Sequence, residues 1–268
     1  MDASGSYIYD NLGCRETELE ILKRQASLAL QLEKAIWEEA GLKPDMDILD
    51  MGCGCGLTSV HLAEYAQAGS VWGVDPSKML ISEAEKLKSE KLLPNLKFSI
   101  GDAYGLSLPN KKFDFVYCRL LFQHLNDSAL ALLNIAGLLK PNGIICITDI
   151  DDSLLFLFPE PADFNDFIDR SVKCQSLNGG DRHVGRKLPL YLNNAGFKNI
   201  KTRIKVISSF DIGVTGFLQT ALDFRVEQLP ADELKTAQTE LNDIYMKMNQ
   251  SFAWGALGLF VATGIKTN

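Results

Sequence analysis

The sequence predicts a doubly wound α/β fold, a mostly parallel sheet of seven strands with helices on both faces. Two observations predict it. Short apolar runs, several of which end in an acidic residue, recur along the chain, and amphipathic stretches of helical period separate them. Strands that alternate with helices form a parallel sheet, because each crossover helix returns the chain to the same end of the sheet. The expected strands are 46–50, 71–75, 96–100, 113–118, 144–150, 197–207 and 258–264.

Composition agrees with one large domain, or one domain with a cap. The chain has 268 residues, of which 46% are apolar, enough for a sizeable core. No apolar run reaches the roughly 18 residues of a membrane span. The first residues carry neither a basic region nor a signal-like apolar stretch. We therefore expect a cytoplasmic protein with no membrane partner.

Charge and cysteine spacing exclude two further classes. A formal net charge of −7 argues against a nucleic-acid partner, which needs a basic surface. The six cysteines form no C-x-x-C pair, so we expect no metal site and interpret them as reduced, mostly buried thiols. They are Cys14, Cys53, Cys55, Cys118, Cys146 and Cys174.

The first element is an amphipathic helix, expected over residues 16–40. Its apolar side chains recur at helical spacing, and Gly41 ends the pattern. The first strand, 46–50, follows and ends in Asp50.

The turn after this strand is the most informative stretch of the chain. It carries three alternating glycines, Gly52, Gly54 and Gly56, before a helical run. Glycine tolerates positive φ and lets a ligand approach the backbone, and the helix start offers unpaired N–H groups. The spacing G-x-G-x-G differs from the dinucleotide fingerprint G-x-G-x-x-G, and no P-loop lysine follows. Asp50 would repel a pyrophosphate and suits a cationic amino-acid group instead.

The next two strands also end in acids. The second ends in Asp75, 19 residues after Gly56, and a carboxylate there can accept hydrogen bonds from ribose hydroxyls. Ser77 is the expected N-cap of the helix that follows. The third strand is followed by Asp102 and Ala103.

In this order and spacing, these motifs resemble the class I S-adenosylmethionine (SAM)-dependent methyltransferases of small-molecule type. The resemblance covers roughly residues 40–205, with a further fit at the last strand. It implies SAM as cofactor and S-adenosylhomocysteine as its product. It also implies that Asp102 accepts from the adenine amino group, with Ala103 adding a backbone N–H.

Other candidate contacts come from segments that reach the same end of the sheet. Met79 could pack on the adenine, and Arg119 and Gln123 follow the fourth strand toward the methionine end. Tyr9 in the N-terminal arm could close over the sulfonium, and Gln25 could face the methionine carboxylate. The expected cofactor contacts are Tyr9, Gln25, Asp50, Gly52, Cys53, Gly54, Asp75, Pro76, Met79, Asp102, Ala103, Arg119 and Gln123.

Methyl transfer needs little from side chains, because a sulfonium methyl is already activated. Holding the acceptor in line supplies most of the catalysis. His124 is the candidate catalytic residue, as a base or a polar contact to the acceptor; the alternative is that it supports its loop. Since no residue stands out as an obligatory base, a nitrogen or carbon acceptor is favoured over oxygen. Asp149, Asp151 and Asp152 could suggest a metal site of the catechol methyltransferase type, but simple strand-end charge explains them better.

The remaining segments are expected to cover the site. Residues 1–45 form an arm and helix over it, and 46–268 form the SAM-binding domain. Its cap inserts lie at about 151–190 and 210–253, and the second is largely helical. We expect a small-molecule acceptor from secondary metabolism, and a monomer or homodimer. Two alternatives remain: a nicotinamide-linked oxidoreductase, and a non-catalytic SAM-binding subunit or sensor.

Overall fold

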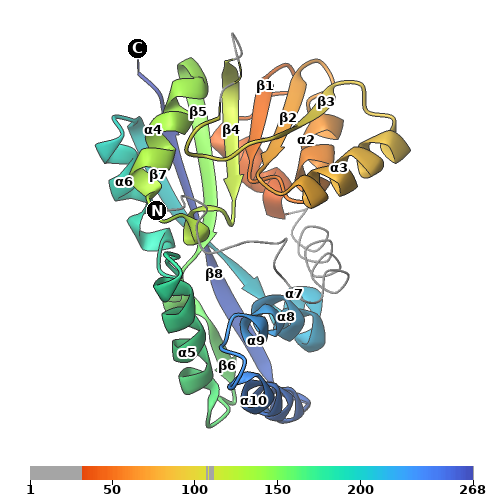
Figure 1. The fold of residues 1–268 in the computed structure, drawn as a ribbon, viewed down its shortest axis with the longest axis vertical. Helices are drawn as coiled ribbons and strands as arrows, with labels where there is room; N and C mark the ends of the chain where they lie inside the picture. Colours follow the sequence, from red (N-terminus) through yellow and green to blue (C-terminus); the bar gives the residue numbers. More distant parts are fainter. Residues whose placement is uncertain (1–31, 107, 109–111, 268) are drawn as a thin grey trace.

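The computed structural model describes residues 32–106, 108 and 112–267, and its centre is one eight-stranded sheet (Figure 1). The strand order is β3-β2-β1-β4-β5-β8-β6, and β7 pairs with β8. The strands are β1 (Asp47–Met51), β2 (Ser70–Asp75), β3 (Leu96–Ile100), β4 (Phe113–Arg119), β5 (Leu139–Ile150), β6 (Phe156–Phe158), β7 (Lys198–Ser208) and β8 (Trp254–Ile265).

Helices connect these strands. Residues 32–40 are helical, as the sequence predicts for the end of the 16–40 helix; residues 16–31 lie outside the described part. The longer helices that follow are α2 (Leu57–Tyr65), α3 (Lys78–Lys91), α4 (Ser128–Leu138), α5 (Phe164–Leu177), α6 (Leu188–Asn194), α8 (Val214–Ala221) and α10 (Leu234–Met248). The shorter ones are α7 (Ser209–Ile212), α9 (Asp223–Glu227) and the 3-10 turns η2 (Phe122–His124), η3 (Asp152–Leu154) and η4 (Gly185–Lys187).

The sheet confirms the predicted doubly wound class. β3, β2, β1, β4 and β5 are parallel neighbours, so their carboxyl ends meet at one edge, while β8 runs antiparallel to β5. The structure differs from the expected strands in three ways. β5 begins at Leu139, five residues earlier than expected. β8 begins four residues earlier than expected, and the unpredicted β6 pairs with that extension. Three residues are too few to show a period, which is why no sequence pattern indicates β6.

Two hydrophobic clusters cover the two faces of the sheet. One joins α4 and α6 to the sheet through residues such as Phe122, Ile135 and Leu192. The other joins helix 32–40 and α2 through residues such as Trp37 and Val60. The sheet is therefore buried on both faces, as parallel sheets are.

A third cluster holds together the cap, by which we mean β6, α5 and α7 to α10. Phe167, Phe217 and Ile244 lie in it, all with 1% exposure or less. In Figure 1 the cap lies below the parallel part of the sheet, beyond the carboxyl ends of its strands. It thus stands at the end of the sheet where the sequence places the site.

Five cysteines lie in the described residues, and all five are free thiols. In the same part of the chain, no cluster of three or more His, Cys, Asp or Glu side chains is arranged to hold a metal ion. No described helix is long and apolar enough to cross a membrane.

Candidate active site

The glycine turn has the backbone geometry that its sequence predicts. Gly52, Gly54 and Gly56 have φ of +76°, +54° and +81°, a region that residues with a Cβ rarely occupy. A Cβ at Gly56 would lie 2.7 Å from the side chains of Ala84 and Phe98, so close packing also requires glycine there. A Cβ at Gly54 would meet no atom within 4 Å. Gly54 therefore faces open space, where a ligand can approach the backbone.

The first turn of α2 offers donors to that space. No side chain caps the helix at Gly56, whereas Ser77 caps α3 by accepting from the Leu80 N–H at 3.2 Å, as the sequence predicts. The first N–H groups of a helix carry partial positive charge and need partners. An uncapped start beside open backbone fits a bound polar ligand.

Asp75 joins the turn to the second strand. Its carboxylate accepts from the Gly54 N–H at 3.0 Å and from the Ser77 N–H at 2.9 Å, and the residue is 8% exposed. The Gly52 and Cys53 N–H groups bind the Val74 carbonyl beside it. The acid is thus fixed at the strand end, next to the open side of the turn.

The third strand brings the other predicted acid to the same edge. Asp102 is exposed, and its Oδ1 accepts from the N–H groups of Tyr104 and Gly105 at 2.7 and 3.0 Å. Ala103 beside it is buried. Across the edge, Pro76 is exposed and Met79 half-buried at the start of α3. The structure places these four residues around one edge of the sheet, and their contact with a cofactor remains a prediction.

Asp50 is less accessible than the sequence suggests. It is 1% exposed, and its Oδ2 accepts from the Ser59 hydroxyl of α2 at 2.6 Å. Burial raises the pKa of Asp50 to about 7, although the Ser59 hydrogen bond opposes the shift. Asp50 therefore ties β1 to α2 beneath the turn.

An ion pair between a half-buried arginine and a buried acid lies near Asp50. Arg119, at the end of β4, donates from Nε to the carboxylate of Glu33 in helix 32–40, and Glu33 is 2% exposed. Burial alone would lower the pKa of Arg119, but the nearby Glu33 carboxylate raises it. This pair fixes the N-terminal helix to the carboxyl end of the sheet.

The loop after β4 is held in a restricted conformation. Leu120 has φ of +51°, unusual for a residue with a side chain, and its N–H binds the Thr148 carbonyl at 2.8 Å. The Gln123 N–H donates to buried Asp149 at 3.2 Å. The Gln123 side chain donates to the Leu120 carbonyl and accepts from Arg182. Both ends of this amide thus have hydrogen-bond partners inside the protein, and a direct contact between Gln123 and the cofactor stays a prediction.

His124 follows in the same loop. Its Nδ1 lies 3.4 Å from the Gln175 Nε2 of α5, and the Gln175 amide also donates to the Gln123 carbonyl at 3.0 Å. Burial, followed by the charge on Arg182, lowers the pKa of His124 to about 3. The ring is therefore neutral at physiological pH and holds a proton poorly.

A buried clamp of charges connects this loop to the cap. Asp152 receives two hydrogen bonds from Arg182, both at 2.9 Å, and two from Arg225 of α9 at 2.8 and 3.0 Å. Arg225 is 1% exposed and also donates to Ser171 of α5. The Phe224 ring lies about 5 Å from both guanidinium groups. We call Asp152, Arg182 and Arg225 the arginine clamp; it joins α5, α9 and the loop after β4.

The three neighbouring acids thus have separate roles. Burial would raise the pKa of Asp152, but Arg225 and Arg182 hold it well below its usual range. Asp151 pairs with Arg186 and His183. Burial raises the pKa of Asp149 to about 7. From the sequence, all three acids are interpreted as simple strand-end charge, and that interpretation does not include the ion pairs of Asp152 with Arg182 and Arg225.

Two predicted contacts, Tyr9 and Gln25, lie outside the described residues. The sequence reasoning missed Glu33, Arg182 and Arg225. Glu33 has the helical spacing of an ordinary surface acid, and nothing local distinguishes the two arginines from surface ones. Only their burial in the folded chain singles them out.

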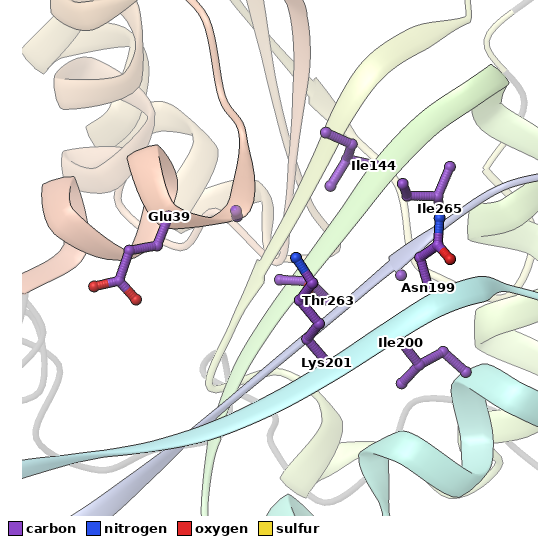
Figure 2. A pocket seen from close by; sticks show the side chains of 9 residues that line it. Glu39, Ile144, Asn199, Ile200, Lys201, Thr263 and Ile265 are labelled. Atoms are coloured by element: carbon purple, nitrogen blue, oxygen red, sulfur yellow. The ribbon is translucent and has the colours of Figure 1, made fainter.

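A separate cavity of about 280 Å³ lies between helix 32–40 and strands β7 and β8 (Figure 2). Glu39, Ile144, Lys201 and Thr263 are among the residues that line it. None of its lining residues belongs to the predicted site.

Comparison with known proteins identifies the class. The family model described as a methyltransferase domain matches residues 42–179, half of the chain, and the protein belongs to this family, the SAM-dependent methyltransferases. An uncharacterised methyltransferase of Schizosaccharomyces pombe is 33% identical over 148 residues, 53% of this chain and 52% of its own. A ubiquinone biosynthesis O-methyltransferase of Coxiella burnetii is 34% identical over 104 residues, 39% of this chain and 43% of its own. This chain thus spans about half or less of the length of these relatives.

Solved structures show the same fold. YcgJ of Bacillus subtilis aligns with a TM-score of 0.60 at 22% identity, covering 90% of this chain and 98% of its own. Phosphoethanolamine N-methyltransferase 2 of Haemonchus contortus aligns with a TM-score of 0.58 at 18% identity, covering 89% and 53%. That structure contains S-adenosylhomocysteine and phosphomonomethylethanolamine. SAM is the cofactor of this class.

Proposed function

We propose that this protein transfers a methyl group from SAM to a nitrogen or carbon atom of a small molecule of secondary metabolism. One observation carries the proposal: the open glycine turn, fixed at Gly54 by the Asp75 carboxylate. In this arrangement an acid, open backbone and uncapped helix N–H groups converge at the carboxyl ends of the strands, where ligands of such sheets bind.

The residues present fit the cofactor. We expect Asp75 to accept from the ribose hydroxyls and Asp102 to accept from the adenine amino group, with Ala103 and Met79 beside the base. Gly52, Cys53 and Gly54 would supply backbone contacts, and Pro76 would border the ribose. Arg119 would pair with the methionine carboxylate while Glu33 holds its guanidinium in place. When bound, SAM supplies a methyl group that is already activated by the sulfonium.

The acceptor atom is argued from the residues near the loop after β4. A hydroxyl acceptor benefits from a general base with a pKa near the working pH. His124 has a pKa of about 3, and Asp149 is fully buried with both oxygens hydrogen-bonded to backbone N–H groups. An amine needs only to arrive unprotonated, and an activated carbon needs no strong base. The task left to His124 is a polar contact that orients the acceptor.

The cap and the N-terminal segment complete the proposal. We expect residues 1–45 and the cap to enclose the acceptor and exclude water from the sulfonium. The arginine clamp supports this, since it fixes α5 and α9 against the loop that carries His124. A net charge of −7 supports a small-molecule acceptor rather than a nucleic acid, and a cytoplasmic enzyme is the setting we propose.

Isothermal calorimetry with S-adenosylhomocysteine, SAM and NAD tests the cofactor assignment. We expect binding of the first two and none of NAD; binding of NAD alone would refute the assignment. A screen of amine, hydroxyl and activated-carbon acceptors with methyl-labelled SAM then tests the reaction. Label transferred to amines or carbon supports the proposal. Transfer to hydroxyls alone contradicts the acceptor class, and binding without transfer to any acceptor would favour a SAM-binding sensor.

A further inference from the structure

An exposed aromatic surface lies on the part of the sheet that extends into the cap. Phe156 and Trp254 contact edge to face with ring centroids 5.0 Å apart, and Phe210 lies 5.8 Å from the same indole. Gly258 lies next to this group, because a Cβ there would touch Leu154 and Ile204. We call this surface the aromatic sheet face; its main residues are Phe156, Phe158, Ile204, Val206, Phe210 and Trp254.

The strand register puts these residues on one side of the sheet. β8 pairs Trp254 with Phe158 and Ala256 with both Phe156 and Ser208. Directly opposed residues share a face, and side chains alternate along each strand. The face therefore continues from β6 across β8 to β7.

The opposite side of the same strands is already covered. Leu157 of β6 is 3% exposed, and a Cβ at Gly255 would touch both Leu157 and Phe217 of α8. On β7, Arg203 and Lys205 point to that other side and pair with Glu39. The cap helices thus bury one side of the extension, and no helix or strand in the described part of the chain covers the aromatic sheet face.

The exposed area is unusually large for a free surface. Phe156, Phe158 and Phe210 are 40%, 55% and 81% exposed, and Ile204 and Val206 are 50% and 63% exposed. At about 200 Å² for each phenylalanine, the three rings alone expose roughly 350 Å². The largest apolar patch on a monomer is about 300–600 Å² and is often functional. With Ile204, Val206 and Leu154 added, the face exposes roughly 600 Å², the lower end of what each partner contributes to a stable interface.

The edge of the sheet beside this face is also open. Among the described residues, β7 pairs only with β8, so its outer edge presents backbone N–H and C=O groups. β7 has no proline, but four of its 11 residues are basic, namely Lys198, Lys201, Arg203 and Lys205. These charges oppose pairing with a second β7, because like charges would meet across the two strands. The aromatic sheet face, and not the edge, is therefore the surface that suits another copy of the chain.

We propose that the aromatic sheet face forms the interface of a homodimer. A two-fold axis that lies parallel to the sheet sets each aromatic face against its counterpart, while the edges of the two β7 strands stay apart. The main residues of the face include no charged side chain, so face-to-face contact brings no like charges together. The glycine turn and the arginine clamp lie outside the face, so the cofactor site of each subunit stays open in the dimer.

Sedimentation velocity between about 1 and 100 µM tests the proposal. The monomer mass is 29.6 kDa, and we expect wild-type protein to sediment as a dimer. Phe158→Lys and Val206→Lys should each weaken the dimer roughly 30-fold or more, as charges do at the centre of an interface. Leu133→Lys is the matched control, because Leu133 is 58% exposed on α4, away from the face; it should remain dimeric.

Two outcomes overturn the proposal. One is wild-type protein that stays monomeric at 100 µM, and the other is a dimer that persists in the Phe158→Lys, Val206→Lys double variant. Co-sedimentation with phosphatidylcholine vesicles distinguishes a lipid surface: monomeric wild-type protein that binds vesicles, with binding lost in the double variant, would assign the face to membranes instead. Calorimetry with S-adenosylhomocysteine should give the same affinity for all variants, which shows that they are folded.

Discussion

The arginine clamp gives the sharpest test of how the cap is attached. Asp152→Asn leaves one acceptor oxygen where the carboxylate now receives four hydrogen bonds from two buried guanidinium groups. Removing one partner of a buried ion pair costs about 3–5 kcal/mol, because the remaining charge has neither water nor a counter-ion. For a chain of this size that corresponds to a fall of roughly 6–20 °C in melting temperature.

Urea unfolding followed by circular dichroism measures this change, with Glu83→Gln as control. Glu83 pairs with Lys86 on the surface, where the lysine side chain is 65% exposed, so its loss should change the free energy of unfolding by less than about 1 kcal/mol. Arg225→Met alone should also be costly. Combined with Asp152→Asn, it should cost less than the sum of the two, because the residues share one network.

The pH dependence supplies a second check. The two arginines hold the folded-state pKa of Asp152 below its unfolded value, so its contribution is present above the unfolded value and is lost as pH falls below about 4. The difference between wild type and Asp152→Asn should shrink in that acid range. If Asp152→Asn unfolds at the same urea concentration as Glu83→Gln, the clamp does not hold the cap.

Three further results are expected. Asp75→Asn should weaken S-adenosylhomocysteine binding about 10- to 150-fold by calorimetry, and an unchanged affinity would exclude Asp75 as a ligand. Gly56→Ala should lower the free energy of unfolding more than Gly54→Ala does, because only a Cβ at Gly56 would meet other side chains. Gly54→Ala should chiefly weaken cofactor binding. If the two variants had equal effects on the free energy of unfolding and on cofactor affinity, they would contradict this geometry. Burial raises the pKa of Asp50 above its unfolded value. Wild type should therefore lose stability relative to Asp50→Asn as pH rises from about 4 to 7, by up to about 4 kcal/mol. A difference in urea midpoints that does not change with pH would show that Asp50 titrates normally.

Much of the fold could be predicted because its signals are local. The apolar runs and the alternating glycines each occupy short stretches of consecutive residues, and parallel strands must bring their carboxyl ends together. Strand order along the chain therefore suffices to assign Asp75 and Asp102 to one edge of the sheet. The N-cap at Ser77 follows from the same local chemistry.

Asp50 and Gln123 show where this reasoning ends. Both stand at strand ends in the sequence, as ligands do, yet Asp50 binds Ser59 and Gln123 binds Arg182 inside the protein. Which way a side chain points at the end of a strand depends on what packs against it, and those partners come from other parts of the chain.

Spacing within short windows of the sequence is enough to predict the class of sheet, the glycine turn and the family. Contacts between distant segments, which form only in the folded chain, account for the remaining features. The arginine clamp joins residues 73 positions apart, the Glu33–Arg119 pair joins residues 86 apart, and the aromatic sheet face combines three strands. Burial changes the energy of a charge or an apolar ring, and it is set by neighbours that no local pattern of residues records.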